Sequence, residues 1–272
     1  MEPLKQAIEK ARCEREAVPR RPEATFTRHP RIRETVVQQP IEYTKTQHVA
    51  PDAETLENHR ILLNSTRDPI SHAYKTLRTQ VRQRLTSKGW NTLAITSALE
   101  GEGKSVIAAN LAIGLARDVN HTVLLADLDL RRPAVHKCFG IEPQRGLSDY
   151  LVEGGDVSDL FINPGVDRLV LLPGHDSIEH SSEALSSPRM VHLLGEIKNR
   201  YKDRIIVLDM PPLLSTDDAI AFAPYVDACL LVVEADKTRK HEIARAMHLL
   251  KRTHLLGTVL NKSREPGHSY YY

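Results

Sequence analysis

Apolar runs of strand length alternate with helix-length segments over residues 92–261, and this alternation limits the fold more than any other feature of the chain. The runs predict strands at 92–97, 122–127, 168–173, 204–209, 227–235 and 255–261. Helical spacing of apolar residues predicts helices at 71–85, 105–119, 186–202 and 238–253. Because strands joined by helices pair in parallel, we predict an α/β fold with a doubly wound, mostly parallel sheet and helices on both faces. The carboxyl ends of the strands then meet at one edge, where ligands bind.

The first 60 residues have a different composition from the rest. They hold 6 of the 16 prolines and none of the 13 glycines, and they are rich in charge. Such a segment buries little apolar area, so we expect residues 1–65 to be largely disordered. Apolar residues at helical spacing over 3–16 predict a short amphipathic helix, either transient in a solvated tail or used for docking. The predicted organisation is an N-terminal segment 1–65, a domain over 66–265 and a flexible tail over 266–272.

The overall composition excludes several classes of protein. Lys plus Arg number 37 against 35 for Asp plus Glu, and this balance argues against a nucleic-acid coat and against an acidic tail. No apolar run approaches the ~18 residues of a membrane span, and the charged N-terminus does not look like a secretory signal. Three widely spaced cysteines, Cys13, Cys138 and Cys229, fit a reducing compartment and offer neither a disulfide framework nor a zinc site.

A glycine-containing loop, SALEGEGKS, follows the first predicted strand and precedes a helix. Its two glycines let backbone N–H groups turn toward an anion, and the start of the helix adds partial positive charge. Lys104 can then reach the β- and γ-phosphates of a nucleotide, and the Ser105 hydroxyl can hold Mg²⁺. An ordinary turn before a helix is the alternative, since Ala98 stands where the GxxxxGK[ST] pattern of a P-loop has its first glycine.

Acidic residues follow two of the predicted strands. Asp127 and Asp129 end the strand 122–127, and their carboxylates project to the same side because they are two residues apart in extended chain. Beside a triphosphate they would hold Mg²⁺ or accept a proton from an attacking hydroxyl; a solvated loop is the alternative. Asp209 ends another buried strand and is followed by two prolines, which fits the Walker B role in the Mg²⁺ shell. Mononucleotide binding at this edge is the predicted chemistry.

Three tyrosines, Tyr270, Tyr271 and Tyr272, follow a short segment that contains Pro and Gly. The last predicted strand ends near Asn261 on the ligand edge, so nine further residues give Tyr270 a reach of at most ~30 Å. We expect the tail to present a phenol to the site of a neighbouring subunit. A hydrophobic terminus that packs on a neighbour is the alternative.

These motifs together resemble the bacterial tyrosine kinases of exopolysaccharide and capsule synthesis, which lie close to the MinD/ParA ATPases among P-loop NTPases. The resemblance covers residues 68–272 and is carried by SALEGEGKS, LLADLDLRRP, VLDMPP and the tyrosine tail. Its most specific element is the D-x-D-x-R-x-P signature of Asp127, Asp129, Arg131 and Pro133. The segment PLKQAIEKARCERE is also similar to the start of cytoplasmic autokinases that accompany exosortase-type exopolysaccharide loci.

The resemblance implies a protein-tyrosine kinase that uses ATP and Mg²⁺ to phosphorylate its own C-terminal tyrosines and so regulates polysaccharide synthesis and export. The implied catalytic residues are Lys104, Asp127, Asp129 and Asp209, with Asp127 as the candidate base. The implied metal ligands are Ser105, Asp129 and Asp209. The nucleotide-binding residues are expected to be Gly101, Glu102, Gly103, Lys104, Ser105, Val106 and Asn261.

The resemblance also implies partners. It predicts a membrane-embedded polysaccharide chain-length regulator as activator, here a separate polypeptide because the sequence shows no spanning segment. We also expect self-association, a cognate tyrosine phosphatase and no nucleic-acid partner. The expected location is cytoplasmic, at the inner face of the cell membrane through the activator.

Some positions depart from the family pattern. Glu100 stands where the family usually has Pro, and Met210 stands where Ser or Thr usually follows the third motif's Asp. The family joins subunits into a ring through Glu-x-x-Arg-x-x-Arg, and here the matching residues are His72, Lys75 and Arg78. Because lysine cannot form the same bidentate pair as arginine, ring assembly by that contact is not expected to be retained in the family's form.

Two further functions therefore stay open. One is a MinD/ParA-like ATPase switch without phosphotransfer to protein, although Leu99 occupies the place of the lysine that those ATPases carry early in the loop. The other is a weakly active nucleotide-binding scaffold that docks partners.

Overall fold

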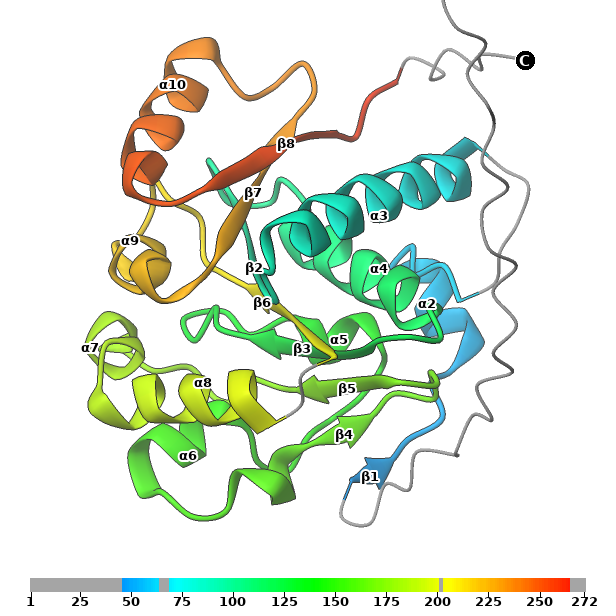
Figure 1. Ribbon diagram of the computed structural model, residues 1–272, viewed down its shortest axis with the longest axis vertical. Coiled ribbons are helices and arrows are strands. Elements are labelled where there is room, and N and C mark those ends of the chain that lie inside the picture. The colour runs from blue at the N-terminus through cyan, green and yellow to red at the C-terminus, as the bar shows by residue number, and fades with distance from the viewer. Residues whose placement is uncertain (1–45, 64–68, 201–202, 265–272) are drawn as a thin grey trace, which may run out of the picture. The chain divides into compact units, whose positions relative to one another are not determined.

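The structure, a computed structural model, describes residues 46–63, 69–200 and 203–264. Within them one eight-stranded sheet has the order β1-β4-β5-β3-β6-β2-β7-β8 (Figure 1). All neighbouring strands pair in parallel except β4 and β5, which are antiparallel. The strands are β1 (Gln47–His48), β2 (Thr92–Ser97), β3 (Thr122–Asp127), β4 (Ile162–Asn163), β5 (Leu169–Leu172), β6 (Arg204–Asp209), β7 (Ala228–Glu234) and β8 (Leu255–Asn261). The predicted α/β fold with a mostly parallel sheet is confirmed.

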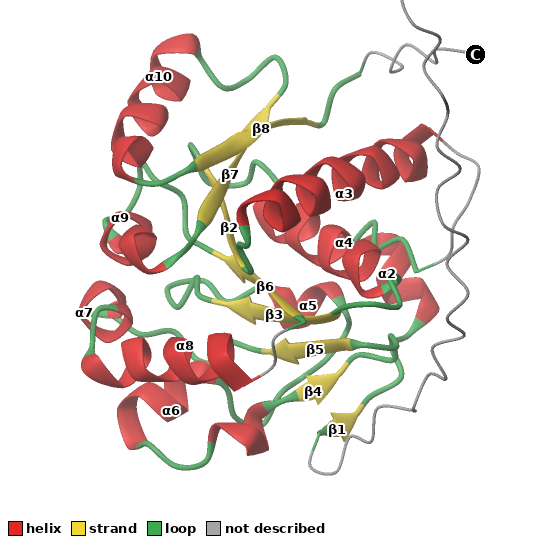
Figure 2. Ribbon diagram, viewed as in Figure 1, coloured by secondary structure: helices red, strands yellow, loops and turns green. Residues whose placement is uncertain are grey.

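Helices cover both faces of the sheet (Figure 2). One face carries α2 (Ala53–Asn58), α3 (Pro69–Lys88), α4 (Lys104–Ala116) and α5 (Val135–Cys138). The other carries α6 (Leu147–Glu153), α7 (Ser181–Leu185), α8 (Pro188–Arg200), α9 (Asp218–Phe222) and α10 (Lys240–Leu249). Short 3-10 helices are η1 (Val157–Leu160), η2 (Ala223–Tyr225) and η3 (Leu250–Arg252). The four helices predicted from periodicity all form, with ends that differ by a few residues.

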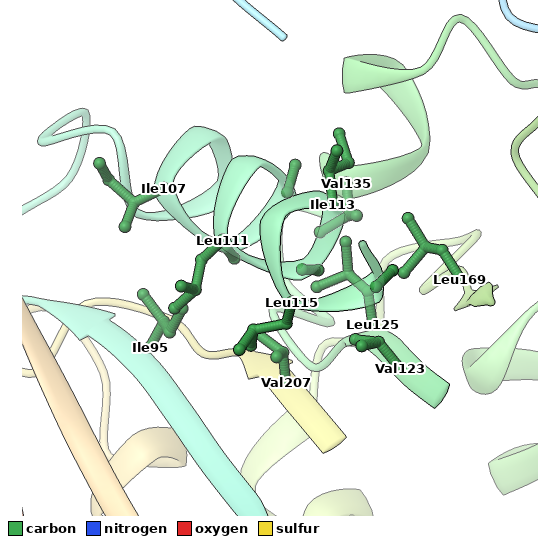
Figure 3. Close-up of a cluster of buried hydrophobic side chains, with 14 of the residues drawn as sticks. Ile95, Ile107, Leu111, Ile113, Leu115, Val123, Leu125, Val135, Leu169 and Val207 are labelled. Carbon is green, nitrogen blue, oxygen red and sulfur yellow. The ribbon is translucent and has the colours of Figure 1, made fainter. Parts of the chain in front are cut away.

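Two hydrophobic clusters, one on each face, hold the layers together. In the cluster of Figure 3, Leu111 and Leu115 of α4 lie over Ile95 of β2 and Val207 of β6. The central strands β2, β3 and β6 are buried along both faces. This double burial explains why their sequences are nearly continuous apolar runs rather than alternating ones.

The segment before α3 differs from the sequence-based expectation of disorder over residues 1–65. Residues 46–63 join the domain: β1 pairs with β4, and Leu56 and Ile61 are buried in the hydrophobic cluster beneath α4. The Asn110 amide of α4 fixes this segment, accepting a bond from the Leu62 N–H at 2.7 Å and donating to the Arg60 carbonyl at 2.9 Å. These long-range contacts compensate for a local composition that is poor in apolar residues. The helix predicted at 3–16 lies outside the described residues.

The carboxyl ends of the central strands come together at one edge of the sheet. Asp127 and Asp209 are register partners at the ends of β3 and β6, and Asp209 is also the partner of Ile95 in β2. The loop that leaves β2 leads directly into α4 at the same edge. No helix among the described residues has the length and apolar character needed to cross a membrane.

Candidate active site

The loop between β2 and α4 has the backbone of an anion-binding turn. Gly101 and Gly103 have φ values of +75° and +92°, a region that favours glycine, and α4 begins at Lys104 immediately afterwards. The N-terminal N–H groups of α4 are free of intrahelical partners and carry partial positive charge. A side chain at Gly103 would also force the Asn261 amide to move, because a Cβ there would clash with Asn261 Nδ2. The predicted phosphate loop therefore has a suitable shape.

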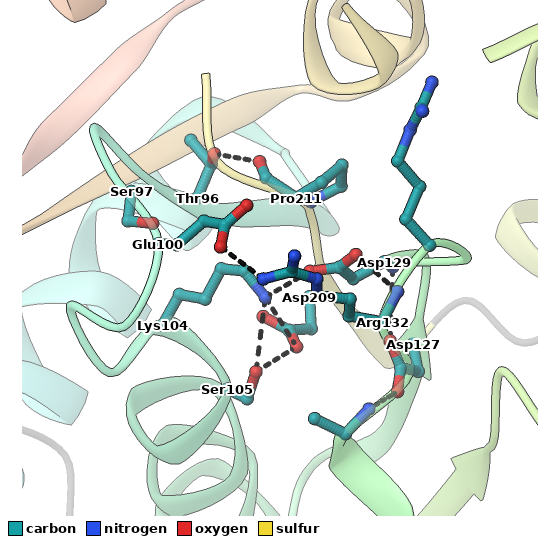
Figure 4. A network of polar contacts seen from close by, with 12 residues as sticks. Thr96, Ser97, Glu100, Lys104, Ser105, Asp127, Asp129, Arg132, Asp209 and Pro211 are labelled. Atoms are coloured by element: carbon teal, nitrogen blue, oxygen red, sulfur yellow. Dashed lines mark hydrogen bonds and ion pairs between the residues drawn. The ribbon is translucent and has the colours of Figure 1, made fainter. Parts of the chain in front are cut away.

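Lys104 and Ser105 join this loop to the acidic strand ends (Figure 4). The Lys104 ammonium lies 2.7 Å from Asp129 Oδ2 and 3.7 Å from Asp209 Oδ2. The Ser105 hydroxyl donates to Asp209 Oδ2 at 2.6 Å. Burial alone would lower the pKa of Lys104, but the charges of Asp209 and Asp129 outweigh it and raise that pKa. The structure thus brings the predicted lysine, serine and two of the predicted carboxylates into one cluster.

Asp127, like Asp209, has no exposed surface. Its Oδ2 atom accepts the N–H groups of Ala134 and Val135 at 2.8 and 2.9 Å, at the start of α5, and Oδ1 accepts the Asp129 N–H at 3.2 Å. Burial and the neighbouring Asp209 carboxylate raise the pKa of Asp127 to about 7. Asp127 therefore shapes the β3–α5 loop through backbone bonds, and its raised pKa favours the protonated form more than in an exposed Asp.

Asp209 has an uncompensated oxygen that fits a metal ion. Its carboxylate is fully buried, and no donor among the described residues bonds to Oδ1, while Oδ2 is shared by Lys104 and Ser105. Burial raises the pKa of Asp209 although Lys104 and Ser105 oppose the shift. A buried carboxylate oxygen without a donor costs free energy unless a cation faces it. The oxygen-rich set of Ser105, Asp129 and Asp209 matches the ligands that Mg²⁺ prefers.

Three residues predicted to bind nucleotide have side chains that contact the loop or the hydrophobic cluster under α4. The Glu102 side chain is buried, with Oε2 accepting the Leu99 N–H at 2.9 Å and Oε1 bonded to the Thr238 hydroxyl. Val106 packs against the hydrophobic cluster under α4. Asn261 donates to the Glu102 carbonyl at 2.8 Å, so its amide lies against the loop at the end of β8. For Glu102 and Val106, the backbone is the part that can face a phosphate.

The sequence interpretation missed several residues that hold this edge together. Lys262 donates to the Gly101 carbonyl at 2.7 Å and pairs with Glu234 at 3.0 Å. Thr238 binds Glu102 from the turn before α10. No local sequence pattern predicts the contacts of Lys262 and Thr238 with the phosphate loop, because each connects residues more than 100 positions apart. Only their location directly after β7 and β8 could have suggested them.

The two arginines of the β3–α5 loop have different partners. Arg131 makes two hydrogen bonds, at 3.0 and 3.3 Å, to the fully buried Asp218 at the start of α9. Arg132 instead reaches across to the phosphate loop and pairs with Glu100. Met210, one of the departures from the family pattern, is buried in the hydrophobic cluster on the α8 face.

Other predicted positions lie away from the cluster or beyond the described residues. His72 and Lys75 are exposed on α3, and the Arg78 side chain runs across Gly114 of α4, 3.5 Å from the position of a Cβ there. Tyr270, Tyr271 and Tyr272 lie outside the described residues. The last described strand, β8, ends at Asn261 beside the loop.

Comparison with known proteins gives consistent relatives. The family model of the CobQ/CobB/MinD/ParA nucleotide binding domain matches residues 93–270. The chain is 31% identical over 206 residues to the putative tyrosine-protein kinase CapB of Staphylococcus aureus, a match that covers 75% of this chain and 89% of the relative. It is 31% identical over 218 residues to the tyrosine-protein kinase YwqD of Bacillus subtilis, with 79% and 91% covered. The succinoglycan biosynthesis transport protein ExoP of Rhizobium meliloti is 31% identical, but the match covers 75% of this chain and 26% of ExoP.

Two solved structures have a similar architecture. The chimerical protein CapA2B2 superposes with a TM-score of 0.69 at 26% identity, covering 80% of this chain and 94% of that one. The VpsO kinase domain gives a TM-score of 0.64 at 30% identity, with 72% and 96% covered. The family match over residues 93–270 includes the phosphate loop and the acidic strand ends.

Proposed function

The chain belongs to the bacterial tyrosine kinases within the CobQ/CobB/MinD/ParA nucleotide-binding family, and we propose that it transfers the γ-phosphate of ATP to tyrosines of its own C-terminal segment. The observation that supports this most directly is the cluster that Lys104 and Ser105, at the start of α4, form with Asp129 after β3 and Asp209 at the end of β6. Kinases and nucleoside triphosphatases need such a combination of phosphate-binding cation, hydroxyl and carboxylates.

In the proposed reaction the triphosphate lies in the loop before α4. Backbone N–H groups of residues 101–105 bind its oxygens, and Lys104 exchanges its contacts with the strand-end carboxylates for contacts with the β- and γ-phosphates. We propose Ser105, Asp129 and Asp209 as the residues that hold Mg²⁺, because they place oxygens, one of them uncompensated, beside Lys104. When bound, Mg²⁺ supplies positive charge that neutralises the phosphate oxygens.

The transfer step forms one bond and breaks one bond. The tyrosine Oη forms a bond to the γ-phosphorus, the bond between that phosphorus and the β–γ bridging oxygen breaks, and ADP leaves. The phenol proton passes to a carboxylate, for which we propose Asp127, whose pKa of about 7 lets it accept a proton near neutral pH. Two backbone N–H groups bond to its Oδ2 atom and one, that of Asp129, bonds to Oδ1, so we propose Oδ1 as the atom that accepts the phenol proton.

We propose Tyr270, Tyr271 and Tyr272 as the acceptors. The position of β8 supports this, since Asn261 at its end bonds to the Glu102 carbonyl of the phosphate loop. Tyr270 follows nine residues later, which allows a reach of at most ~30 Å. A short segment must bend sharply to enter its own site, so we propose transfer to the tail of a neighbouring copy. This also requires self-association of the chain.

We propose that the kinase regulates exopolysaccharide or capsule synthesis. The relatives named above support this, since the name of ExoP describes a biosynthesis transport protein for succinoglycan. The proposed activator is a separate, membrane-embedded polysaccharide chain-length regulator that keeps the kinase at the inner face of the membrane. A tyrosine phosphatase would reverse the modification.

Mapping of transferred phosphate tests the proposal. The full chain is incubated with ATP labelled at the γ-position and Mg²⁺, with and without the cytoplasmic part of the activator, and the labelled residues are identified by mass spectrometry. We expect label on Tyr270–Tyr272 that is lost in Lys104→Met and in the triple Tyr→Phe variant of the tail. Tyr225→Phe is the matched control, because Tyr225 is a partly exposed tyrosine outside the tail.

Other outcomes would contradict the proposal. Label retained in the triple tail variant would exclude the tail as acceptor. Steady release of phosphate without labelled protein would instead support an ATPase switch, the alternative suggested by the breadth of the matching family model. Nucleotide binding without phosphotransfer to protein and without ATP hydrolysis would support a nucleotide-binding scaffold instead.

A further inference from the structure

We propose that Arg132 binds the terminal phosphate of the nucleoside triphosphate, and that Glu100 competes with that phosphate for the Arg132 guanidinium. The inference rests on the proposed function, because it assigns a triphosphate to the loop before α4. It adds a phosphate-binding residue and a competing carboxylate that the nucleotide-binding motifs do not include. The two residues would together make the site respond to the third phosphate.

The pair connects the two halves of the site. Glu100 belongs to the phosphate loop between β2 and α4, and Arg132 belongs to the loop between β3 and α5. Their side chains form an ion pair although they are 32 positions apart in the sequence. Figure 4 shows the Arg132 side chain extending from the end of β3 toward the phosphate loop that carries Lys104. The guanidinium therefore bridges the edge at which the phosphates would lie.

The backbone of Arg132 is fixed to the catalytic cluster. Its N–H donates to Asp129 Oδ1 at 3.2 Å, and the other oxygen of Asp129 lies 2.7 Å from the Lys104 ammonium. One carboxylate thus contacts both the Lys104 ammonium and the backbone of Arg132. Arg132 follows β3, the strand that ends at the proposed base Asp127, so in the proposed reaction it lies on the side from which the phosphoryl acceptor approaches the terminal phosphate.

The neighbouring arginine shows that this pairing is not a general property of the loop. Arg131 binds Asp218, a carboxylate with 0% exposure that also accepts the Ser181 hydroxyl at 2.8 Å. Breaking that contact would leave a buried charge, so it is a fixed structural pair. The Arg132 and Glu100 side chains are 74% and 50% exposed, and water can solvate each of them after separation. An exposed pair of this kind is readily exchanged for another partner.

Charge favours that exchange. Glu100, Asp127, Asp129 and Asp209 carry carboxylates around the phosphate loop, whereas Lys104 and Arg132 are the cations that pair with them. Lys104 is already engaged by two buried carboxylates. A triphosphate adds about four negative charges, so its binding is favoured by a second cation besides Lys104, which Arg132 can supply. The negative charge of Glu100 repels the triphosphate. The triphosphate carries several negative charges where Glu100 carries one, so it is the stronger partner for the Arg132 guanidinium.

Binding of two nucleotides that differ in the third phosphate tests the inference. Calorimetric titrations of the full chain use ADP and the β,γ-imido analogue of ATP, each with Mg²⁺. We expect Arg132→Ala to weaken binding of the analogue about 10-fold and to change ADP binding less than about twofold. We expect Glu100→Gln to tighten binding of the analogue about 3-fold, again with little effect on ADP. Glu153→Gln is the matched control, since Glu153 forms an exposed ion pair with Arg145 elsewhere.

The double variant separates competition from a general charge effect. If Glu100 acts by occupying Arg132, Glu100→Gln has no effect in the Arg132→Ala background. Tightening that persists there, or equal effects of Arg132→Ala on both nucleotides, would overturn the inference. Thermal unfolding of each variant checks that the fold is retained. If the native chain binds neither nucleotide, the proposed function fails as well; if it binds both and the variants do not discriminate, only this inference fails.

Discussion

The Lys104 ammonium lies 2.7 Å from the Asp129 carboxylate, and this contact joins the first residue of α4 to the loop after β3. Asp209 lies 3.7 Å from the same ammonium and accepts the Ser105 hydroxyl. One cation therefore balances part of the charge of two largely buried carboxylates, with Asp127 as a third nearby. The stability of this edge depends on which of these charges is present.

We predict that Lys104→Met destabilises the protein and that Asp129→Asn does not. Removing the ammonium leaves Asp129 and Asp209 uncompensated, which should lower the free energy of unfolding by about 2–3 kcal/mol at pH 8. Removing one carboxylate from an acid-rich cluster relieves repulsion and should change that free energy by less than about 1 kcal/mol. Urea denaturation at pH 8 with a chelator measures both. An equal loss in the two variants would show that the ion pair itself, rather than the charge balance, stabilises the edge.

We predict that Asp127 makes the protein less stable as the pH rises toward 7. Burial and the Asp209 charge raise its pKa to about 7, above the ~3.9 of an unfolded Asp. Between these values the folded chain holds a proton that the unfolded chain has lost, so the unfolding free energy falls by at most about 1.4 kcal/mol per pH unit. Asp209, whose pKa is also raised by burial, acts in the same direction.

Other titratable groups also contribute to the pH dependence of the unfolding free energy, and their contribution must be separated from that of Asp127. Burial lowers the pKa of His136, which makes the protein more stable as the pH rises through the range where an exposed histidine loses its proton. The measurement is therefore the difference between the native chain and Asp127→Asn in denaturant titrations at pH 5, 6 and 7. We expect the native chain to show the more negative slope. Parallel slopes would mean that Asp127 is ionised throughout this range.

The site could be predicted from the sequence where its residues adjoin strand ends. The carboxyl ends of parallel strands meet at one edge of the sheet, so residues that follow them lie there independently of loop conformation. In the structure Lys104, Asp127 and Asp209 lie together at that edge. The contacts that complete the edge could not be predicted in this way. Glu102 with Thr238, and Lys262 with Gly101, connect loops that are remote in sequence, and their pairing depends on side-chain packing that no local spacing records.

The strands could also be predicted from the sequence, because their apolar runs are local features. The expectation of disorder was wrong for residues 46–63, where it rested on composition alone. Strands such as β6 are recognised because burial on both faces demands a continuous apolar run. Residues 46–63 lack such a run, and only Leu56 and Ile61 are buried hydrophobic residues among them. Their structure depends on Asn110, an amide within α4 that is satisfied by the segment's own backbone. A composition average cannot detect this dependence.

We predict that Gly103→Ala disrupts the phosphate loop. The backbone at Gly103 has φ +92°, and a Cβ would displace Asn261 from its hydrogen bond to the Glu102 carbonyl. The unfolding free energy should fall by about 1–3 kcal/mol, and nucleotide binding should be lost. Gly89→Ala is the matched control, because it also has a positive φ of +66° but meets nothing within 4 Å. Unchanged nucleotide binding in Gly103→Ala would show that the loop does not need this conformation.

We predict that the segment before α3 is a structural part of the domain. Leu56 and Ile61 are each 6% exposed within the hydrophobic cluster beneath α4. Truncation of either to Ala should lower the unfolding free energy by about 2–4 kcal/mol, because it removes buried methyl groups and leaves a cavity. Asn110→Ala should have a similar effect, since it removes the bonds to Leu62 N–H and the Arg60 carbonyl.

Ile70→Ala provides the control for these truncations, because Ile70 is 61% exposed at the start of α3 and should change the unfolding free energy by less than about 0.5 kcal/mol. Urea denaturation followed by circular dichroism measures all four variants. If Leu56→Ala and Ile61→Ala unfold at the same urea concentration as the native chain, residues 46–63 are dispensable for stability. A loss confined to these two and Asn110→Ala would instead mean that the domain begins well before residue 66, and that a chain shortened to start there would expose the cluster beneath α4.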